Sequence, residues 1–94
     1  MPKTPNYFKG RTLVITGAGS GIGRATAAIF GREGANVVCA DIDEQSAVAA
    51  ARETEDAGGV ASGIHVDVTD RASVQNMVAK SIGKYGQVDF LFNS

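Results

Sequence analysis

The sequence is poor in the residue types from which disulfide frameworks and metal centres are built. It contains one cysteine, one histidine and no tryptophan. A single cysteine, Cys39, cannot form an internal disulfide, and one cysteine with one histidine cannot complete a zinc site. We therefore expect no disulfide and no metal ion, and the reducing cytoplasm is the simplest location for such a chain.

An excess of one charge and a long apolar run are also lacking. Nine basic and ten acidic residues leave a net charge of −1, which argues against a nucleic-acid footprint and against an anchor on acidic membranes. No apolar run reaches the length that spans a bilayer. The apolar stretch that follows residues 1–6 is too short for a secretory signal. We therefore expect neither nucleic acid nor membrane as a partner.

Proline is scarce, since the only two, Pro2 and Pro5, stand among the first five residues. Their position indicates a short irregular arm rather than a linker. The length of 94 residues suits one small domain. The proportions of 44% hydrophobic and 20% charged residues are typical of a globular protein.

What the sequence does contain is an unbroken alternation of strand-like and helix-like segments. Runs of β-branched or small apolar residues predict strands over Thr12–Thr16, Asn36–Asp41, 60–66 and 88–92. Helices are predicted over 22–33, over 44–57 and over a third segment that ends before Gly86. The expected caps and stops are Asp43 for the second helix, Asp70 or Thr69 for the third, and glycine stops at Gly34, Gly58-Gly59 and Gly86.

Helical spacing also predicts which side chains face the core. For the first helix the apolar positions are Ile22, Ala25, Thr26, Ile29 and Phe30. For the third helix they are Val74, Met77, Val78, Ser81, Ile82 and Tyr85. Gly31 stands inside the first helix, where glycine costs about 1 kcal/mol relative to alanine, and the sequence offers no reason for it.

Strand–helix units of this length predict an α/β fold with a parallel sheet and right-handed crossovers. In the doubly wound arrangement the helices cover both faces and the strand order is 3-2-1-4. The fourth strand would then be an open apolar edge, which natural sheets rarely leave bare. We therefore expect residues 1–94 to be the N-terminal part of a longer single-domain protein.

The most informative segment is Thr16-Gly17-Ala18-Gly19-Ser20-Gly21-Ile22-Gly23, which follows the first predicted strand and opens the first predicted helix. Glycines there allow a sharp turn, and the helix N-terminus offers unpaired N–H groups to an anion. The pattern matches neither G-x-G-x-x-G nor the P-loop. It matches Thr-Gly-x-x-x-Gly-x-Gly, and we interpret it as a dinucleotide site.

This motif resembles that of the short-chain dehydrogenase/reductase family. The resemblance continues through Asp41, through Asp67-Val68-Thr69-Asp70 and to Asn93, in the family's order and at familiar spacing. It covers essentially the whole chain, but only the cofactor-binding front half of a typical member. The resemblance implies a Rossmann-like fold, a nicotinamide dinucleotide as cofactor and an oxidoreductase activity.

Each residue of the motif has an expected role in holding the cofactor. Gly17 makes the tight turn, Gly21 lets the backbone approach the pyrophosphate, and Gly23 permits close packing of helix on strand. Ser20 is expected to add a hydroxyl contact, and Ile22 a backbone N–H contact near the nicotinamide. The alternative is a glycine-rich turn that binds no ligand. Arg24 is expected on the solvent side of the helix rather than at a phosphate.

Asp41 ends the second predicted strand, where a carboxylate can accept the ribose hydroxyls of the adenosine half. It would repel a 2′-phosphate, and no lysine or arginine lies in 18–20 or directly after it to offset that charge. NAD is therefore expected rather than NADP. The alternative is that Asp41 merely caps the second helix, as Asp43 also could.

Three further cofactor contacts follow from the resemblance alone. It implies that Asp67 bonds the adenine amino group, that Val68 lines the adenine pocket, and that Asn93 ties the fourth strand to its neighbours and contacts a cofactor ribose. The alternative for Asp67 is a cap on the third helix. Ser94 stands where the family has a second asparagine, which bears on the structural tie at Asn93.

The family's catalytic residues have no counterparts here. The resemblance implies a tyrosine acid/base, a lysine that lowers its pKa and a serine that orients the substrate, all expected beyond Ser94. Tyr85 is no match for Tyr-x-x-x-Lys because Asp89 stands four residues later, and Tyr85, His65 and Cys39 are expected to be structural.

We therefore expect this segment to bind the cofactor and to be inactive by itself. The whole protein is expected to transfer hydride between NAD(H) and a small alcohol or carbonyl substrate and to be a homodimer or homotetramer. The alternatives are a non-catalytic relative that binds NAD or senses its redox state, and a half-fold completed by another chain.

Overall fold

The computed structural model describes residues 8–94, so the predicted proline-containing arm lies outside the described residues. Four strands alternate with three helices, as the sequence predicts. Along the chain they are β1 (Thr12–Thr16), α1 (Gly21–Arg32), β2 (Asn36–Asp41), α2 (Glu44–Asp56), β3 (Val60–His65), α3 (Arg71–Tyr85) and β4 (Phe90–Asn93).

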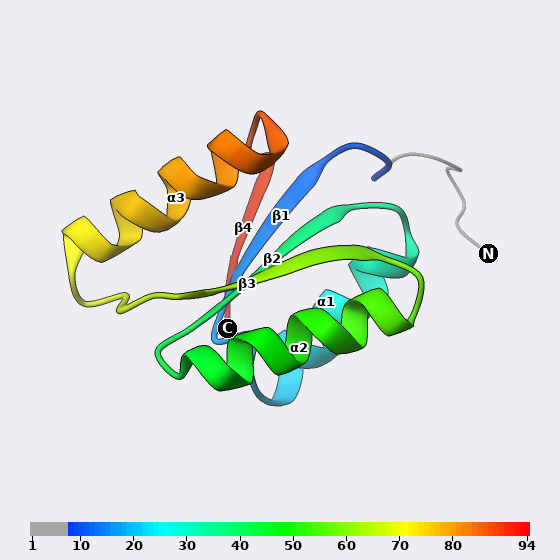
Figure 1. The fold of residues 1–94 in the computed structure, drawn as a ribbon, viewed down its shortest axis with the longest axis horizontal. Coiled ribbons are helices and arrows are strands. Elements are labelled where there is room, and N and C mark those ends of the chain that lie inside the picture. The colour runs from blue at the N-terminus through cyan, green and yellow to red at the C-terminus, as the bar shows by residue number, and fades with distance from the viewer. Residues whose placement is uncertain (1–7) are drawn as a thin grey trace.

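The strands form one parallel sheet in the order β3-β2-β1-β4, which confirms the predicted topology. Figure 1 shows α1 and α2 together on one face and α3 on the other. Successive strand residues serve opposite faces: Val37 and Cys39 pack with α1 and α2, whereas Val38 packs with Met77 of α3. Both faces are apolar because both are covered.

The predicted caps are confirmed for α2 and α3. The Asp43 carboxylate accepts hydrogen bonds from two N–H groups in the first turn of α2, and Asp70 accepts one from Ala72 N at 3.0 Å. Asp70, rather than Thr69, is therefore the cap of α3. Gly86 ends α3 in the left-handed conformation, with φ of 87°.

The face predicted for α1 is right for Phe30, which is half-buried against the core, and wrong for the two isoleucines. The buried residues of α1 are Gly23, Ala27 and Gly31, whereas Ile22 and Ile29 are 73% and 53% exposed. Helical periodicity identifies large apolar side chains, but α1 lies so close to its neighbours that small residues form the contact. The prediction for α3 is right for Met77 and Ser81 and wrong for Ile82, which is exposed.

β4 begins two residues later than predicted. Asp89 already binds β1, because its backbone N–H donates to Thr12 O at 2.9 Å and its carboxylate accepts from Thr12 N at 2.8 Å. The regular ladder with β1 then starts at Phe90. Within the described range 8–94, β4 pairs only with β1, and Leu91 is 58% exposed.

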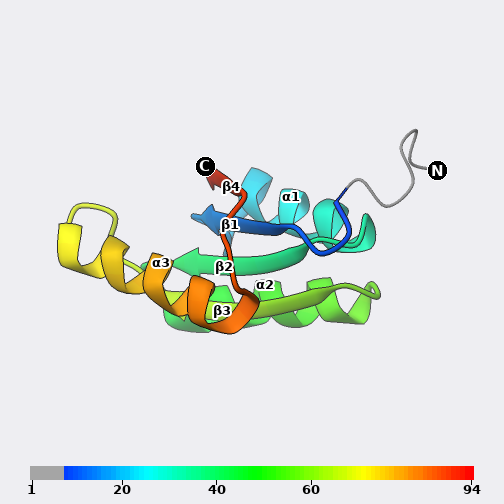
Figure 2. The same ribbon diagram turned by 90° about the horizontal axis from the view of Figure 1, so that it is seen from above.

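An apolar hollow of about 520 Å³ lies beside this open strand. It is lined by Phe8, Leu13, Thr26, Phe30, Phe90, Leu91 and Phe92. Figure 2, seen from above, shows β4 at the margin of the sheet beyond β1.

None of the helices within residues 8–94 combines the length and the apolar character needed to cross a bilayer.

Gly31, which the sequence left unexplained, lies where α1 contacts α2. A Cβ built on Gly31 would stand 2.3 Å from Thr54 Cγ2. Thr54 is fully buried and its hydroxyl donates to Ala50 O at 3.0 Å, so its β-branched side chain has little freedom to move away. Only glycine therefore allows this approach of the two helices.

We expect Gly31→Ala to destabilise the protein despite alanine's better helix propensity. Overpacking costs about 1–3 kcal/mol, against a propensity gain of about 1 kcal/mol. Gly83→Ala is the matched control, since Gly83 lies within α3 and a Cβ there meets nothing within 4 Å. Denaturant unfolding of the two variants should give shifts of opposite sign, and equal stabilisation of both would contradict this packing.

Candidate functional site

The glycine-rich turn lies where the order of the strands reverses. It leaves β1, which has β2 on one side and β4 on the other, and it enters α1. Ala18 N donates to Ala40 O at 3.0 Å and so ties the turn to β2. Ligands of open parallel sheets bind in the crevice at such a reversal, so the predicted site has the expected place in the fold.

The glycines of the motif differ in what surrounds them. Gly17 has φ of 69°, and a Cβ built on Gly23 would stand 2.4 Å from Gly17 O, so no side chain fits at Gly23. This close contact agrees with the packing role predicted for Gly23. Gly21 has φ of 54°, and a Cβ there would meet no atom within 4 Å. Gly21 therefore faces open space at the first turn of α1.

Gly19 has a role that sequence reasoning did not assign. Its N–H donates to Asp41 Oδ2 at 2.9 Å, and a Cβ built on it would stand 2.4 Å from Ser46 Cβ. The glycine itself was visible in the sequence. Its contacts on β2 and α2 were not, because they lie more than 20 residues away along the chain.

Asp41 is half-buried at the end of β2 and holds the turn rather than the helix. Its Oδ2 accepts from Gly19 N, and its Oδ1 accepts from Asp43 N at 3.0 Å. The cap of α2 is Asp43, so the alternative that Asp41 merely caps this helix is wrong. A carboxylate has about four lone-pair sites, so both oxygens can still accept a hydroxyl.

Asp67 follows β3 and makes a tight turn of its own. Its Oδ1 accepts from Thr69 Oγ1 at 2.6 Å and from Thr69 N at 2.9 Å. These two bonds, with a smaller contribution from His65, lower the pKa of the Asp67 carboxyl. Because Asp70 caps α3, Asp67 does not, and Val68 beside it is 55% exposed.

Asn93 ties β4 to β1 at the same edge of the sheet. Its Oδ1 accepts from Thr16 Oγ1 at 2.5 Å. Ser94, which replaces the family's second asparagine, donates from its backbone N–H to Thr16 O and from its hydroxyl to Gly17 O, both at 3.3 Å. The connection between β4 and the glycine turn is therefore present with serine at this position.

One hollow of about 320 Å³ brings most of these residues together. It is lined by Thr16, Gly17, Asp41, Ile42, Val66, Asp67, Val68, Thr69, Asn93 and Ser94. Five of the nine predicted cofactor residues are among them. Ser20, Gly21, Ile22 and Gly23 lie outside this hollow at the beginning of α1, and Ser20 uses its side chain for no capping bond to any described residue.

Arg24 joins the glycine turn to α2. Its Nε and Nη2 donate to the two carboxylate oxygens of Glu53 at 2.7 and 2.5 Å, and its Nη1 donates to Gly19 O at 3.2 Å. The hydrogen bond and charge of Glu53 raise the pKa of Arg24, and the bond from Arg24 lowers the pKa of Glu53. The Arg24 side chain is 37% exposed, so it lies on the solvent side of α1 as predicted, held there by its bonds to Glu53 and Gly19.

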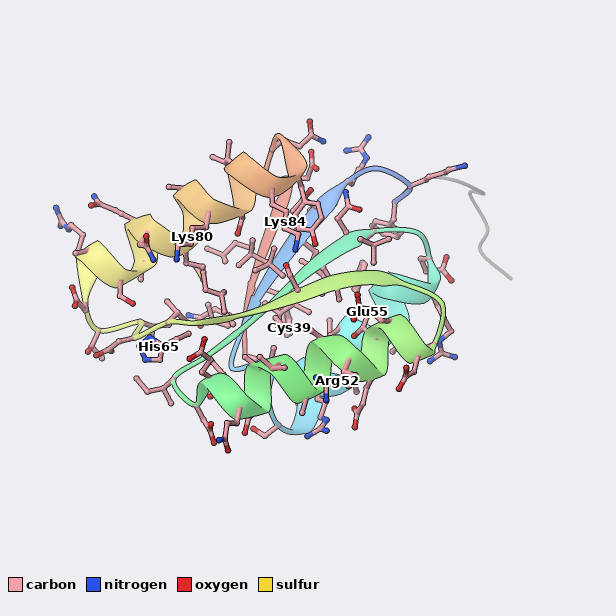
Figure 3. The ribbon with its side chains drawn as sticks, viewed as in Figure 1. Cys39, Arg52, Glu55, His65, Lys80 and Lys84 are labelled. Atoms are coloured by element: carbon pink, nitrogen blue, oxygen red, sulfur yellow. The ribbon has the colours of Figure 1, made fainter. Side chains whose placement is uncertain are left out.

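Three residues that the sequence analysis expected to be structural, His65, Cys39 and Tyr85, do not line this hollow. His65 is exposed at the end of β3, and Cys39 lies within the sheet (Figure 3). Burial raises the pKa of the Cys39 thiol to about 11, so it stays protonated and unreactive at neutral pH. Tyr85 is half-buried, with its hydroxyl 3.2 Å from Ser62 Oγ. Residues 8–94 contain no cluster of three side chains suited to hold a metal.

Comparison of the sequence with known proteins indicates the same family as the glycine motif does. A family model described as short chain dehydrogenase matches residues 11–94. The chain is 38% identical over 87 residues to the 3-oxoacyl-[acyl-carrier-protein] reductase FabG of Thermotoga maritima, covering 93% of this chain and 35% of that protein. It is 45% identical over 85 residues to sorbitol dehydrogenase of Cereibacter sphaeroides, covering 90% of this chain and 32% of that protein.

A comparison of the fold with solved structures indicates the same family. The crystal structure of hydroxysteroid dehydrogenase from Escherichia coli superposes with a TM-score of 0.89 and 36% sequence identity. The match covers 92% of this chain and 37% of that one. The chain therefore spans about a third of the length of these three relatives, less than the front half expected from the resemblance.

Proposed function

The chain belongs to the short-chain dehydrogenase family, and from this premise we propose that it carries the nicotinamide-nucleotide site of an NAD-dependent oxidoreductase. One observation supports the site most strongly. Residues from three separate strand ends, Asp41, Asp67 and Asn93, line a single hollow together with the first glycine of the turn. The family usually binds a nicotinamide cofactor, and the polar side chains of this hollow would offer it hydrogen-bond donors and acceptors.

The polar groups suit the successive parts of a dinucleotide. The open face of Gly21 and the N-terminus of α1 leave room and unpaired N–H groups for the pyrophosphate. The Ser20 hydroxyl and the Ile22 N–H would add contacts there. When bound, the nicotinamide supplies the chemistry by accepting or donating hydride.

The strand ends would hold the two nucleoside halves. Asp41 would accept the adenosine ribose hydroxyls. Asp67 would accept the adenine amino group, and Val68 would cover the adenine ring. Asn93, already fixed to Thr16, would contact the ribose on the nicotinamide side.

The charges around the hollow support NAD rather than NADP. The Asp41 carboxylate would stand beside the ribose and would repel a 2′-phosphate. Arg24 is the nearby cation, but both carboxylate oxygens of Glu53 accept its donors and offset its charge. The 2′-phosphate of NADP would therefore meet the uncompensated charge of Asp41 and an arginine, Arg24, that already bonds Glu53.

We propose an alcohol or carbonyl compound as the substrate class of the whole protein. Two relatives bear the names of dehydrogenases and one that of a reductase. The family's Tyr-x-x-x-Lys is absent from residues 1–94. In this proposal residues 1–94 form the NAD-binding part of a single larger domain, bind the cofactor without performing the chemistry, and belong to a homo-oligomer.

Calorimetric titration of the complete natural polypeptide with NAD, NADH, NADP and NADPH tests this function. We expect binding of NAD and NADH, with NADP at least about tenfold weaker, a difference of 1.4 kcal/mol. Nicotinamide mononucleotide, which lacks the adenosine half, serves as the control and should bind far more weakly. Absence of heat and of NADH fluorescence change at saturating nucleotide would refute the proposal.

A further inference from the structure

We propose that Arg24 and Glu53 are positioning residues for the adenosine end of the cofactor site, and that they act through the backbone of Gly19. The inference rests on the proposed NAD site but adds two residues to it. Neither lines the hollow that holds Asp41 and Asn93. Glu53 lies well along α2, and its connection to the glycine turn is visible only in the folded chain.

The first step in the argument is the geometry of the arginine. Nε and Nη2 donate to the two carboxylate oxygens of Glu53, which is a bidentate arrangement. This pair orients the planar guanidinium so that its remaining nitrogen, Nη1, donates to Gly19 O. A lysine in this place would be a point charge without the rigid fork and could not hold both partners in the same way.

The second step is that Gly19 is held through both of the peptide groups that flank its Cα. Its carbonyl accepts from Arg24, and its N–H donates to Asp41 Oδ2 at 2.9 Å. Gly19 is also buried against Ser46, with no room for a side chain. Because Gly19 is buried against Ser46, the bond from Arg24 to its carbonyl also restricts the rotation of the neighbouring peptide group, whose N–H orients the Asp41 carboxylate.

The third step concerns charge. Arg24 is a permanent cation that bonds the same glycine as Asp41, the residue proposed to exclude a 2′-phosphate. Glu53 accepts hydrogen bonds from two nitrogens of Arg24, and these bonds hold the guanidinium toward α2 and offset the arginine's charge. Without Glu53, the guanidinium would be free to turn toward an anion near Asp41. Glu53 is therefore expected to support the preference for NAD, although it does not touch the cofactor.

A simpler explanation is a surface ion pair that only joins α1 to α2. Exposed pairs of this kind contribute little to stability, and Glu53 is 56% exposed. The two explanations differ in one bond, that from Arg24 to Gly19 O. A charge-swapped double variant, Arg24→Glu with Glu53→Arg, can restore an ion pair between the helices but has no donor on α1 for the Gly19 carbonyl.

The experiment measures Kd for NAD, for ADP-ribose and for NADP, with thermal unfolding alongside, in the complete natural polypeptide. The variants are Arg24→Ala, Arg24→Lys, Glu53→Gln and the charge-swapped double. The matched control is Glu55→Gln, which removes a carboxylate from an exposed position two residues further along the same helix. Figure 3 shows Glu55 on α2, well away from the end of the helix nearest the glycine turn.

We expect Arg24→Ala to weaken binding of NAD and of ADP-ribose by about five- to tenfold, a typical effect for residues coupled in one network. Binding of NADP should change less, so the NAD/NADP preference falls. Glu53→Gln should reduce that preference as well, and Arg24→Lys should fail to restore wild-type affinity. The charge-swapped double should recover the unfolding temperature without recovering affinity, and Glu55→Gln should match the wild type.

Two results would overturn the inference while leaving the proposed function in place. One is an Arg24→Ala variant whose Kd for NAD and whose NAD/NADP preference stay within twofold of the wild type. The other is recovery of both affinity and unfolding temperature by the charge-swapped double, which would show that the ion pair alone matters. Failure of the unsubstituted protein to bind any nicotinamide nucleotide would instead remove the proposed function and this inference with it.

Discussion

Replacing Gly21 with valine is expected to lower the affinity for NAD by about a hundredfold, which corresponds to about 2.8 kcal/mol of binding free energy. Gly21 has φ of 54° and faces open space at the first turn of α1. A branched side chain would occupy the space that the pyrophosphate needs and would keep it from the helix N–H groups. Calorimetric titration of the variant with NAD measures the loss.

Gly86→Val is the matched control for this experiment. Gly86 also has a positive φ, of 87°, and open space around its Cβ position, but it ends α3 far along the chain from the glycine turn. Both valines should therefore cost stability because a branched residue is strained at positive φ. Only Gly21→Val should lose NAD, and nearly unchanged NAD affinity in that variant would contradict the assigned place of the pyrophosphate.

Replacing Asp41 with asparagine is expected to reduce the preference for NAD over NADP by about tenfold or more, because juxtaposed like charges cost several kcal/mol. The amide has one acceptor oxygen, whereas Gly19 N and Asp43 N now donate to separate carboxylate oxygens, so both bonds cannot keep their present geometry. Affinity for NAD should fall because the ribose hydroxyls lose a carboxylate acceptor. Affinity for NADP should fall less or rise, because the repulsion of the 2′-phosphate is gone.

Asp43→Asn provides the comparison for Asp41. It removes the same charge two residues away and keeps a good helix cap, since asparagine caps about as well as aspartate. We expect it to leave the ratio of the two dissociation constants unchanged. Equal ratios for both variants would mean that general electrostatics, rather than a direct contact from Asp41, sets cofactor preference.

The local features of the fold could be predicted because their causes are local. Asp43 and Asp70 cap the helices that directly follow them, with acceptor and donor two or three residues apart. Gly86 is a helix stop because glycine alone takes a left-handed backbone without cost. The strand order followed from the alternation of elements, since right-handed crossovers leave few arrangements of a parallel sheet.

The wrong predictions for the buried face of α1 and the unexplained Gly31 have a common physical reason. Periodicity weighs how apolar a side chain is, and it therefore selected Ile22 and Ile29 for the buried face of α1. The real contact is made by Gly23, Ala27 and Gly31, because what decides close packing between helices is the size and shape of the partner surfaces. Thr54, which makes Gly31 necessary, lies 23 residues further along the chain.

The sequence by itself determined the alternation of elements, their caps, the family resemblance and the residues proposed to hold the cofactor. Helix caps and the glycine turn depend on residues that are neighbours in the sequence, so the sequence alone reveals them. Only the tertiary structure decided that Asp41 accepts a hydrogen bond from Gly19 N, that Arg24 connects Gly19 O to Glu53, and which face of α1 is buried. Those contacts join segments that only folding brings together, and their geometry depends on close packing that spacing along the chain does not encode.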